Sequence, residues 1–238
     1  MKPDAIHALR ISLKRLLALW RLAERADAVP ETTHSAVRER LKAAAQKLSR
    51  TRDAQVLRKL WSEFGLGDAA PFLGGTTGNI SVLTGAEVKT ISRLIGDSQG
   101  RLPPVETSGR WQRALARAYR HARGKMPDTA QAGDKRFHAW RTAVKELFYG
   151  LEAWPGGEAA YLRNLARRLD RLQSRLGDAH DLVLLEKAAA GLRDIPQSAR
   201  IPYPAKAVRR KKQLKRESLE TGARAFGAST RGFRKHLG

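Results

Sequence analysis

A motif at helical spacing occurs twice in this chain and constrains its fold more than any other feature. The stretch IHALRISLKRLL covers residues 6–17, and FHAWRTAVKELF covers residues 137–148. Both contain the pattern His-x-x-Arg-x-x-x-Lys, which comprises His7, Arg10 and Lys14 in the first copy and His138, Arg141 and Lys145 in the second. Positions i, i+3 and i+7 of an α-helix lie on one face. Each copy therefore predicts a helix with a narrow basic stripe.

An apolar stripe runs beside each basic stripe. It includes Leu13 and Trp20 in the first copy and Trp140 and Leu147 in the second, and we expect these residues to face the core. Strand signals are nearly absent, and Leu, Ala and Arg recur at helical spacing. The sequence therefore predicts an all-α fold, with long helices near residues 4–26, 33–64, 109–126, 135–154, 158–191 and 205–235.

A second pair of segments extends the repeat. KLSRTRDAQVL (residues 47–57) aligns without gaps to RLGDAHDLVLL (residues 175–185), and Asp53 corresponds to Asp181. Each half thus has a helix with the histidine motif followed by a long helix with the aspartate motif. Repeats of this length usually bury their apolar faces against one another. We expect a single domain over residues 1–238, built as a pseudo-symmetric pair of helical bundles.

A segment of different composition separates the repeats. Residues from about 65 to 107 begin with a Gly- and Thr-rich stretch that is nearly free of basic residues, and we expect irregular structure with one short helix. Thr84 and Glu87 fit a capping box that would begin this helix. The first repeat then covers about 1–107, and the second covers about 108–238.

The charge of the chain predicts a polyanionic partner. Its 46 Lys and Arg residues face 23 Asp and Glu residues, which gives a formal net charge of +23. Such a surplus repels itself in the folded state, so nucleic acid, an acidic membrane surface or polyphosphate would each fit it. The absence of Cys excludes disulfides and thiolate metal sites. Because no signal peptide and no apolar run near the roughly 18 residues of a membrane span is found, we expect a soluble, cytoplasmic protein.

Cations lie on one face of several further predicted helices. One such face is usually only solvated, but its recurrence on most helices favours a shared basic surface or channel. Arg offers a planar fork for phosphate oxygens, and Lys offers a mobile point charge. The candidate binding residues are His7, Arg10, Lys14, Arg15, Arg21, Lys42, Arg52, Arg117, Arg120, His138, Arg141, Lys145, Arg168, Arg171, Arg175, His180, Arg209 and Lys212. We expect the acids Asp53 and Asp181 to hold a neighbouring Arg or His through charge-assisted hydrogen bonds.

Three classes of function fit these features to different degrees. The pair His180–Asp181 is of the kind that metal-dependent phosphohydrolases use, but its equivalent is Arg52–Asp53, and Arg does not ligate a metal. Nucleic-acid binding explains the charge equally well. It would need exposed aromatic residues for stacking, whereas the aromatic residues here mostly occupy apolar stripes. A chain of phosphates without bases needs only spaced cations. We therefore expect a non-enzymatic polyphosphate-binding protein without cofactor or metal, with nucleic-acid binding and phosphohydrolysis as alternatives.

The duplicated set of motifs resembles a known family. HALRISLKRL and HAWRTAVKELFYGLE, followed by RTRDAQVL and LGDAHDLVLL, are similar to the CHAD family (conserved histidine α-helical domain). The resemblance implies two four-helix bundles related by pseudo-twofold symmetry, around a basic central cavity or groove that binds inorganic polyphosphate. Location at polyphosphate granules is consistent with this. The family's motif positions correspond to His7, Arg10, Lys14, Arg15, Arg52, Asp53, His138, Arg141, Lys145, His180 and Asp181.

Two features depart from the family pattern. Glu146 stands where the first copy has Arg15, so we expect a weaker second basic stripe at its edge. The segment at the centre of the chain is short and rich in Gly. We therefore expect shortened helices at the third position of the first bundle.

Overall fold

The computed structural model describes residues 3–66, 83–191 and 203–238, and within them the fold is helical throughout, without strands. The all-α prediction is therefore confirmed. None of the described helices is long and apolar enough to cross a membrane. The helices are α1 (Pro3–Arg25), α2 (Glu31–Glu63), α4 (Gly85–Gly100), α5 (Gly109–Gly124), α6 (Asp134–Glu152), α7 (Ala160–Gly191), α8 (Ala205–Ala225) and α9 (Thr230–Lys235).

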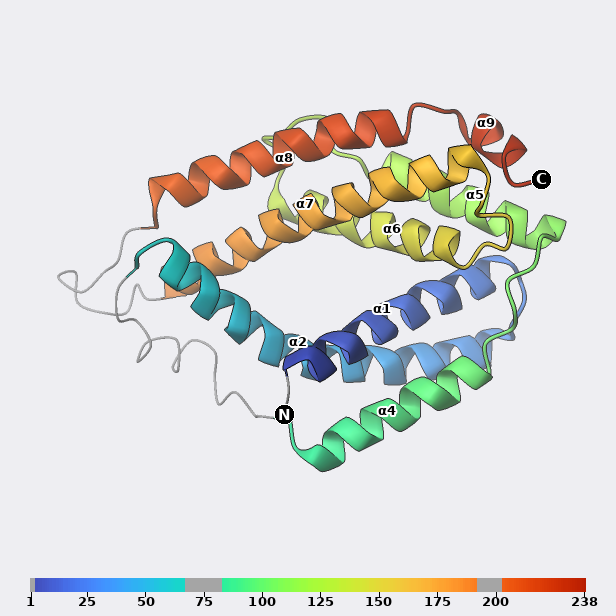
Figure 1. Ribbon diagram of the computed structural model, residues 1–238, viewed down its shortest axis with the longest axis horizontal. Coiled ribbons are helices and arrows are strands. Elements are labelled where there is room, and N and C mark those ends of the chain that lie inside the picture. The colour runs from blue at the N-terminus through green and yellow to red at the C-terminus, as the bar shows by residue number, and fades with distance from the viewer. Residues whose placement is uncertain (1–2, 67–82, 192–202) are drawn as a thin grey trace.

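The helices that carry the two copies of each motif pair with one another. Helix α1 packs on α2 and α6 packs on α7, and these two pairs meet through contacts of α1 with α6 and of α2 with α7 (Figure 1). Helix α4 covers α1 and α2, α8 runs along α7, and α5 packs on α1 and α6. The third position of the first bundle falls within residues 67–82, which lie outside the described residues. The arrangement as two four-helix bundles stays a prediction.

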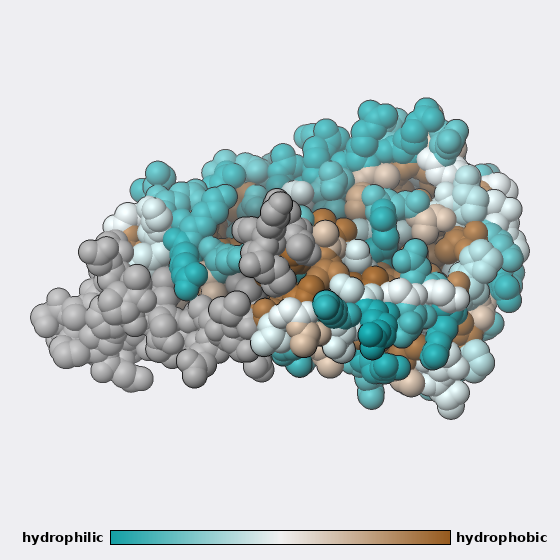
Figure 2. Space-filling model, turned by 60° about the horizontal axis from the view of Figure 1, so that its bottom comes forward, coloured by the Kyte–Doolittle hydropathy of each residue, from teal (hydrophilic) through white to brown (hydrophobic). Residues whose placement is uncertain are grey.

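Tryptophan side chains occupy the centre of the core. Trp20, Trp111 and Trp140 are completely buried, together with Leu13 and Leu147. This confirms the expectation that the apolar stripes of α1 and α6 face inward. Trp20 Nε1 donates to the carbonyl oxygen of Ser98 at 3.3 Å, which links α1 to α4. In Figure 2, hydrophilic residues cover most of the visible described face, and hydrophobic residues show in the hollows between them.

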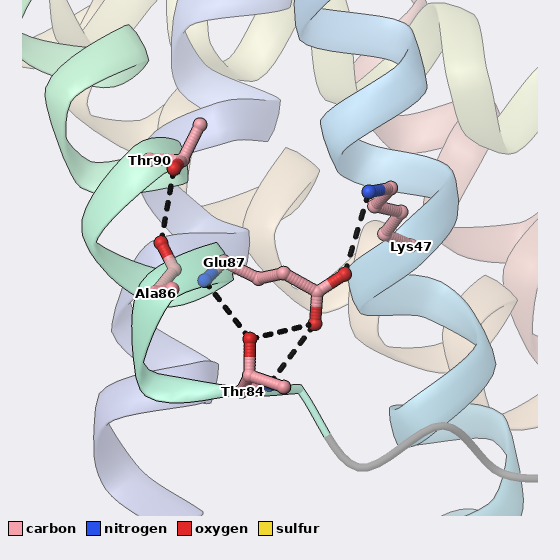
Figure 3. A network of polar contacts seen from close by, with 5 residues as sticks. All are labelled: Lys47, Thr84, Ala86, Glu87 and Thr90. Carbon is pink, nitrogen blue, oxygen red and sulfur yellow. Dashed lines mark hydrogen bonds and ion pairs between the residues drawn. The ribbon is translucent and has the colours of Figure 1, made fainter.

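The predicted capping box begins α4 (Figure 3). The Thr84 hydroxyl accepts from the Glu87 amide at 3.2 Å, and the Glu87 carboxylate accepts from the Thr84 amide at 3.0 Å. The same carboxylate accepts from Lys47 Nζ at 3.4 Å, which ties the start of α4 to α2. The helix runs on for 16 residues. The helix predicted after Thr84 is therefore confirmed.

The expectation of one helix over residues 205–235 is wrong, because the chain leaves the helix at Phe226. A new helix, α9, begins after Ser229, whose hydroxyl accepts from the Gly232 amide at 3.0 Å. The break lets Phe226 and Phe233 both pack against Tyr119 of α5. Burial of these two rings stabilises the turn.

Gly222 allows α8 to approach α6 closely. A Cβ atom there would lie 2.6 Å from Trp140 Cζ2, and Trp140 is fully buried. We predict that Gly222→Ala lowers the free energy of unfolding by about 1–3 kcal/mol through overpacking, as measured by urea denaturation. Gly96→Ala is the control, because Gly96 is exposed inside α4 with open space around it. The free energy of unfolding of the Gly96→Ala variant should rise by about 0.5–1 kcal/mol. Equal stability of the two variants would contradict the close approach of α8 to α6 at Gly222.

Candidate functional site

A cavity of about 870 Å³ lies between the two copies of the motif. Residues of α1, α2, α6, α7 and the first half of α8 line it. Both copies contribute their Arg and Lys: the cationic and histidine side chains on the lining are His7, Arg10, Lys14, Arg52, Lys59, Arg141, Lys145 and Arg210. We call this space the central cavity. Six of the sequence-predicted binding residues meet there, and they come from both halves of the chain.

Burial and mutual repulsion act on the cations of the central cavity. Burial, aided by the charges of Arg141 and Lys14, lowers the pKa of Lys145 to about 6. The pKa of Lys14 falls to about 8 and that of Arg10 to about 10, again through burial first and neighbouring cations second. The pKa of Arg141 is also lowered, chiefly by burial. The burial of these side chains and their mutual repulsion therefore both disfavour positive charge in the central cavity.

An ion pair joins the two halves at the wall of this cavity. Arg52 Nη1 donates to Asp181 Oδ1 at 2.6 Å, and Nη2 donates to the second oxygen of the same carboxylate. Asp53 Oδ1 accepts from the same guanidinium at 3.4 Å. Burial alone would lower the pKa of Arg52, but these carboxylates outweigh it and raise that pKa. The two acids thus hold an Arg, as the sequence predicts.

Arg141 keeps a buried donor free. Its Nε atom is buried and has no hydrogen-bond partner among the described residues. A Cβ atom at Gly177 of α7 would lie 4.0 Å from this nitrogen, so the helix backbone passes close to the guanidinium. Arg141 Nε is the member of this class of buried atoms that belongs to a residue lining the central cavity, and it could donate to an anion bound there.

The histidines of the motifs separate into two groups. His7 lines the central cavity, whereas His138 and His180 do not. The rings of His138 and His180 lie beside each other, with centroids 4.9 Å apart. Burial and the charge of Arg141 lower the pKa of both, and that of His180 falls to about 4. This pair is therefore uncharged at neutral pH.

The edge of the basic stripe is neutralised by acids. Arg15 is exposed and pairs with Glu152 at 2.8 Å. Glu146, buried in α6, pairs with Arg25 and lies 3.8 Å from Arg21. The weaker edge expected at Glu146 is thus an ion-paired patch outside the central cavity.

The other predicted binding residues lie elsewhere on the surface. Arg117 and Arg120 line a cavity between α5 and α9. Arg168, Arg171 and Arg175 line a smaller cavity with Thr221 and Arg224 of α8. Three further cations are exposed outside the central cavity, namely Lys42 on α2 and Arg209 and Lys212 on α8. The described residues therefore distribute the cations over several sites, not over one shared channel.

The lining of the central cavity also includes residues that the sequence prediction did not name, among them the cations Lys59 and Arg210, the aromatic residue Tyr149 and the acids Glu63, Asp170 and Asp178. Lys59 follows Arg52 at i+7, and Tyr149 follows Lys145 at i+4, so both continue a stripe that the motif had already defined. Arg210 lies inside the run RRKKQLKR, where sequence alone does not distinguish inward from outward residues. Its neighbour Lys211 pairs with Glu186 and Asp134 instead.

The arrangement is suited to binding an extended anion. Its guanidinium and ammonium groups come from facing helices. Seven Lys and Arg residues outnumber the four acids of the lining, Glu63, Asp170, Asp178 and Asp181, of which Asp181 pairs with Arg52. Among the described residues, no group of three or more His, Cys, Asp or Glu side chains is placed to hold a metal ion.

The chain is thus an all-helical protein in which duplicated basic motifs converge on one cavity. The sequence model of the family described as CHAD domain matches residues 1–77 and 82–190, which is most of the chain. The protein belongs to this CHAD domain family. In comparisons with curated proteins and with solved structures, nothing matches the chain.

The lowered pKa of Lys145 predicts that this residue costs stability. Lys145 loses its ammonium proton near pH 6 in the folded state and near pH 10.5 in the unfolded state. Between these pH values only the unfolded state holds the proton, so the proton stabilises the unfolded state and lowers the free energy of unfolding. We predict that Lys145→Met raises the free energy of unfolding at pH 7 by about 0.5–2 kcal/mol. The gain should shrink as the pH approaches 10.5. Thermal unfolding across this pH range tests it, and a destabilised variant would show that Lys145 has an unrecognised partner.

Proposed function

We propose that this protein binds inorganic polyphosphate in the central cavity. The observation that carries the proposal is the convergence of Arg10, Lys14, Arg141 and Lys145, two cations from each motif copy, in one partly buried space. Their lowered pKa values reflect burial without enough opposing charge. A polyanion would supply that charge and would give the buried Nε of Arg141 an acceptor. Membership of the CHAD domain family supports the same ligand class.

The lining favours phosphate chains over nucleic acid. Phe64 and Tyr149 are its aromatic members, and Tyr149 is buried, so stacking surfaces for successive bases are scarce. Spaced Arg forks and Lys charges meet the needs of a polymer that consists of phosphate alone. We infer that the protein binds this polymer without cleaving it, because Arg52 stands where the second motif copy has His180, and Arg does not ligate a metal ion. A location at polyphosphate granules is consistent with such binding.

We predict that Lys14→Met combined with Lys145→Met weakens polyphosphate binding about 100-fold or more. Two charged contacts of about 1.5–3 kcal/mol each would be lost. The measurement is calorimetric titration with long-chain polyphosphate at about 0.15 M salt, where exposed charges are largely screened. Because the same variant should be more stable than the wild type, weaker binding could not be ascribed to unfolding.

Lys89→Met combined with Lys135→Met serves as the matched control, since both lysines are exposed and lie outside the central cavity. It removes the same number of lysines by the same substitution and should leave the affinity within about twofold. Equal losses in the two double variants would refute a dedicated site. Competition by double-stranded DNA and tRNA completes the test, because even competition would indicate a general polyanion surface.

Binding should also take up protons. An anion beside Lys145 raises the pKa of this residue from about 6 toward its ordinary value of 10.5, so at pH 7.5 a mostly neutral amine becomes charged. Lys14, with a pKa of about 8, contributes a smaller share. The affinity should therefore fall as the pH rises above 6, by up to about tenfold per unit for each group. Titrations in buffers of different ionisation enthalpy measure the uptake, which should nearly disappear in the Lys14→Met, Lys145→Met variant.

A further inference from the structure

We propose a second phosphate-chain site in the cavity between α5 and α9, so that one protein molecule holds two separate stretches of polymer. This inference rests on the proposed function for the identity of the ligand. The cavity has a volume of about 640 Å³ and shares no lining residue with the central cavity. Figure 1 places α9 at the end of the molecule opposite the C-terminal end of α2, which lines the central cavity. We call this space the α5–α9 cavity.

The charged side chains that line the α5–α9 cavity all have one sign. They are six cations, with no acidic side chain among them: Arg113, Arg117, Arg120, Arg231, Arg234 and Lys235. None of the six forms an ion pair with an acid in the described parts of the chain. An ordinary solvated surface intersperses acids among such cations, because like charges at i+4 repel one another. This cavity therefore has the charge of an anion site.

The two walls present their cations toward one another. Arg113, Arg117 and Arg120 follow the spacing i, i+4 and i+7 on α5, which places them on one face of this helix. The short helix α9 supplies the opposite wall. Arg117 Nη1 donates to the carbonyl oxygen of Arg25 at 3.1 Å, so this side chain has a defined position at the edge of the cavity. Five of the six cations are Arg, whose planar forks suit phosphate oxygens.

Apolar packing fixes the distance between these walls. Phe233 of α9 is fully buried and stacks on Tyr119 of α5, with ring centroids 4.3 Å apart. Tyr119 Oη donates to the carbonyl oxygen of Ala228 at 2.9 Å. Gln112 Nε2 donates to the carbonyl oxygen of Gly238 at 2.5 Å and closes the far side. Repulsion between the cations is thus opposed by the core, as in the central cavity, and the hollow is preformed for a ligand.

Two separate sites on one molecule would let the protein bridge phosphate chains. A long polymer that occupies the central cavity of one molecule can enter the α5–α9 cavity of another. Multivalent linkage of this kind gathers polymer and protein into large assemblies without any further contact between protein molecules. A protein with the central cavity alone would coat the polymer and leave it dispersed.

The test combines a short and a long ligand. Tripolyphosphate reports the number of sites by calorimetric titration, and long-chain polyphosphate reports bridging by light scattering. Arg120→Gln combined with Arg234→Gln removes two cations of the α5–α9 cavity whose side chains form no hydrogen bond or ion pair within residues 3–66, 83–191 and 203–238. The matched control, Arg40→Gln combined with Arg93→Gln, removes two exposed cations of α2 and α4. We expect the wild type and the control to bind two tripolyphosphates and to scatter strongly.

The Arg120→Gln, Arg234→Gln variant should bind one tripolyphosphate and lose the scattering, and so should Lys14→Met with Lys145→Met. If the Arg120→Gln, Arg234→Gln variant keeps the wild-type stoichiometry and scattering, the second site is refuted while the central site stands. The opposite result would be that the Lys14→Met, Lys145→Met variant keeps the wild-type stoichiometry while the Arg120→Gln, Arg234→Gln variant binds less tripolyphosphate. That result would refute the proposed function of the central cavity instead. A wild type that binds neither ligand overturns both proposals.

Discussion

Apolar packing that holds like charges together is the constraint on which the central cavity depends. The buried stripes of α1 and α6 keep these helices in contact, so Lys14 and Lys145 remain near each other despite their repulsion. The ion pair of Arg52 with Asp181 adds a polar link between α2 and α7. Part of the free energy of folding therefore offsets electrostatic repulsion, and a bound anion would return it as stability.

Local sequence patterns predict the helical fold, but they do not predict that the chain leaves the helix between α8 and α9. The apolar stripes that include Trp20 and Trp140 place α1 and α6, and the capping box at Thr84 places the start of α4. The turn between α8 and α9 has only a short signal, Gly227 and the cap residue Ser229, and residues with helical spacing continue on both sides of it. Its cause is tertiary, since Phe226 and Phe233 both reach Tyr119 only if the chain bends. Long-range packing of this kind leaves no period in the sequence.

The part of the candidate site that comes from the duplicated motif was predictable from the sequence. The duplication of the motif identified Arg10 and Lys14 and their equivalents Arg141 and Lys145, and all four residues line the central cavity. The stripe of Arg168, Arg171 and Arg175 has the same kind of pattern, yet it lines a different cavity. Which stripe faces which space depends on the rotation and crossing of helices, and a one-dimensional pattern does not contain either quantity. Two residues, Lys59 and Tyr149, could have been found by continuing the motif stripes by another turn or two.

The different partners of Arg15 and Glu146 show what a single chain gains over a symmetric dimer. In a twofold assembly of identical chains, both positions would carry the same residue, because isologous interfaces repeat every side chain. Two arginines would then face the cations at the ends of the opposing helices. With both copies in one polypeptide, one arginine pairs with Glu152 while the other position holds an acid for Arg25. Fusion of the halves thus permits opposite charges at equivalent places, and it fixes one orientation of assembly.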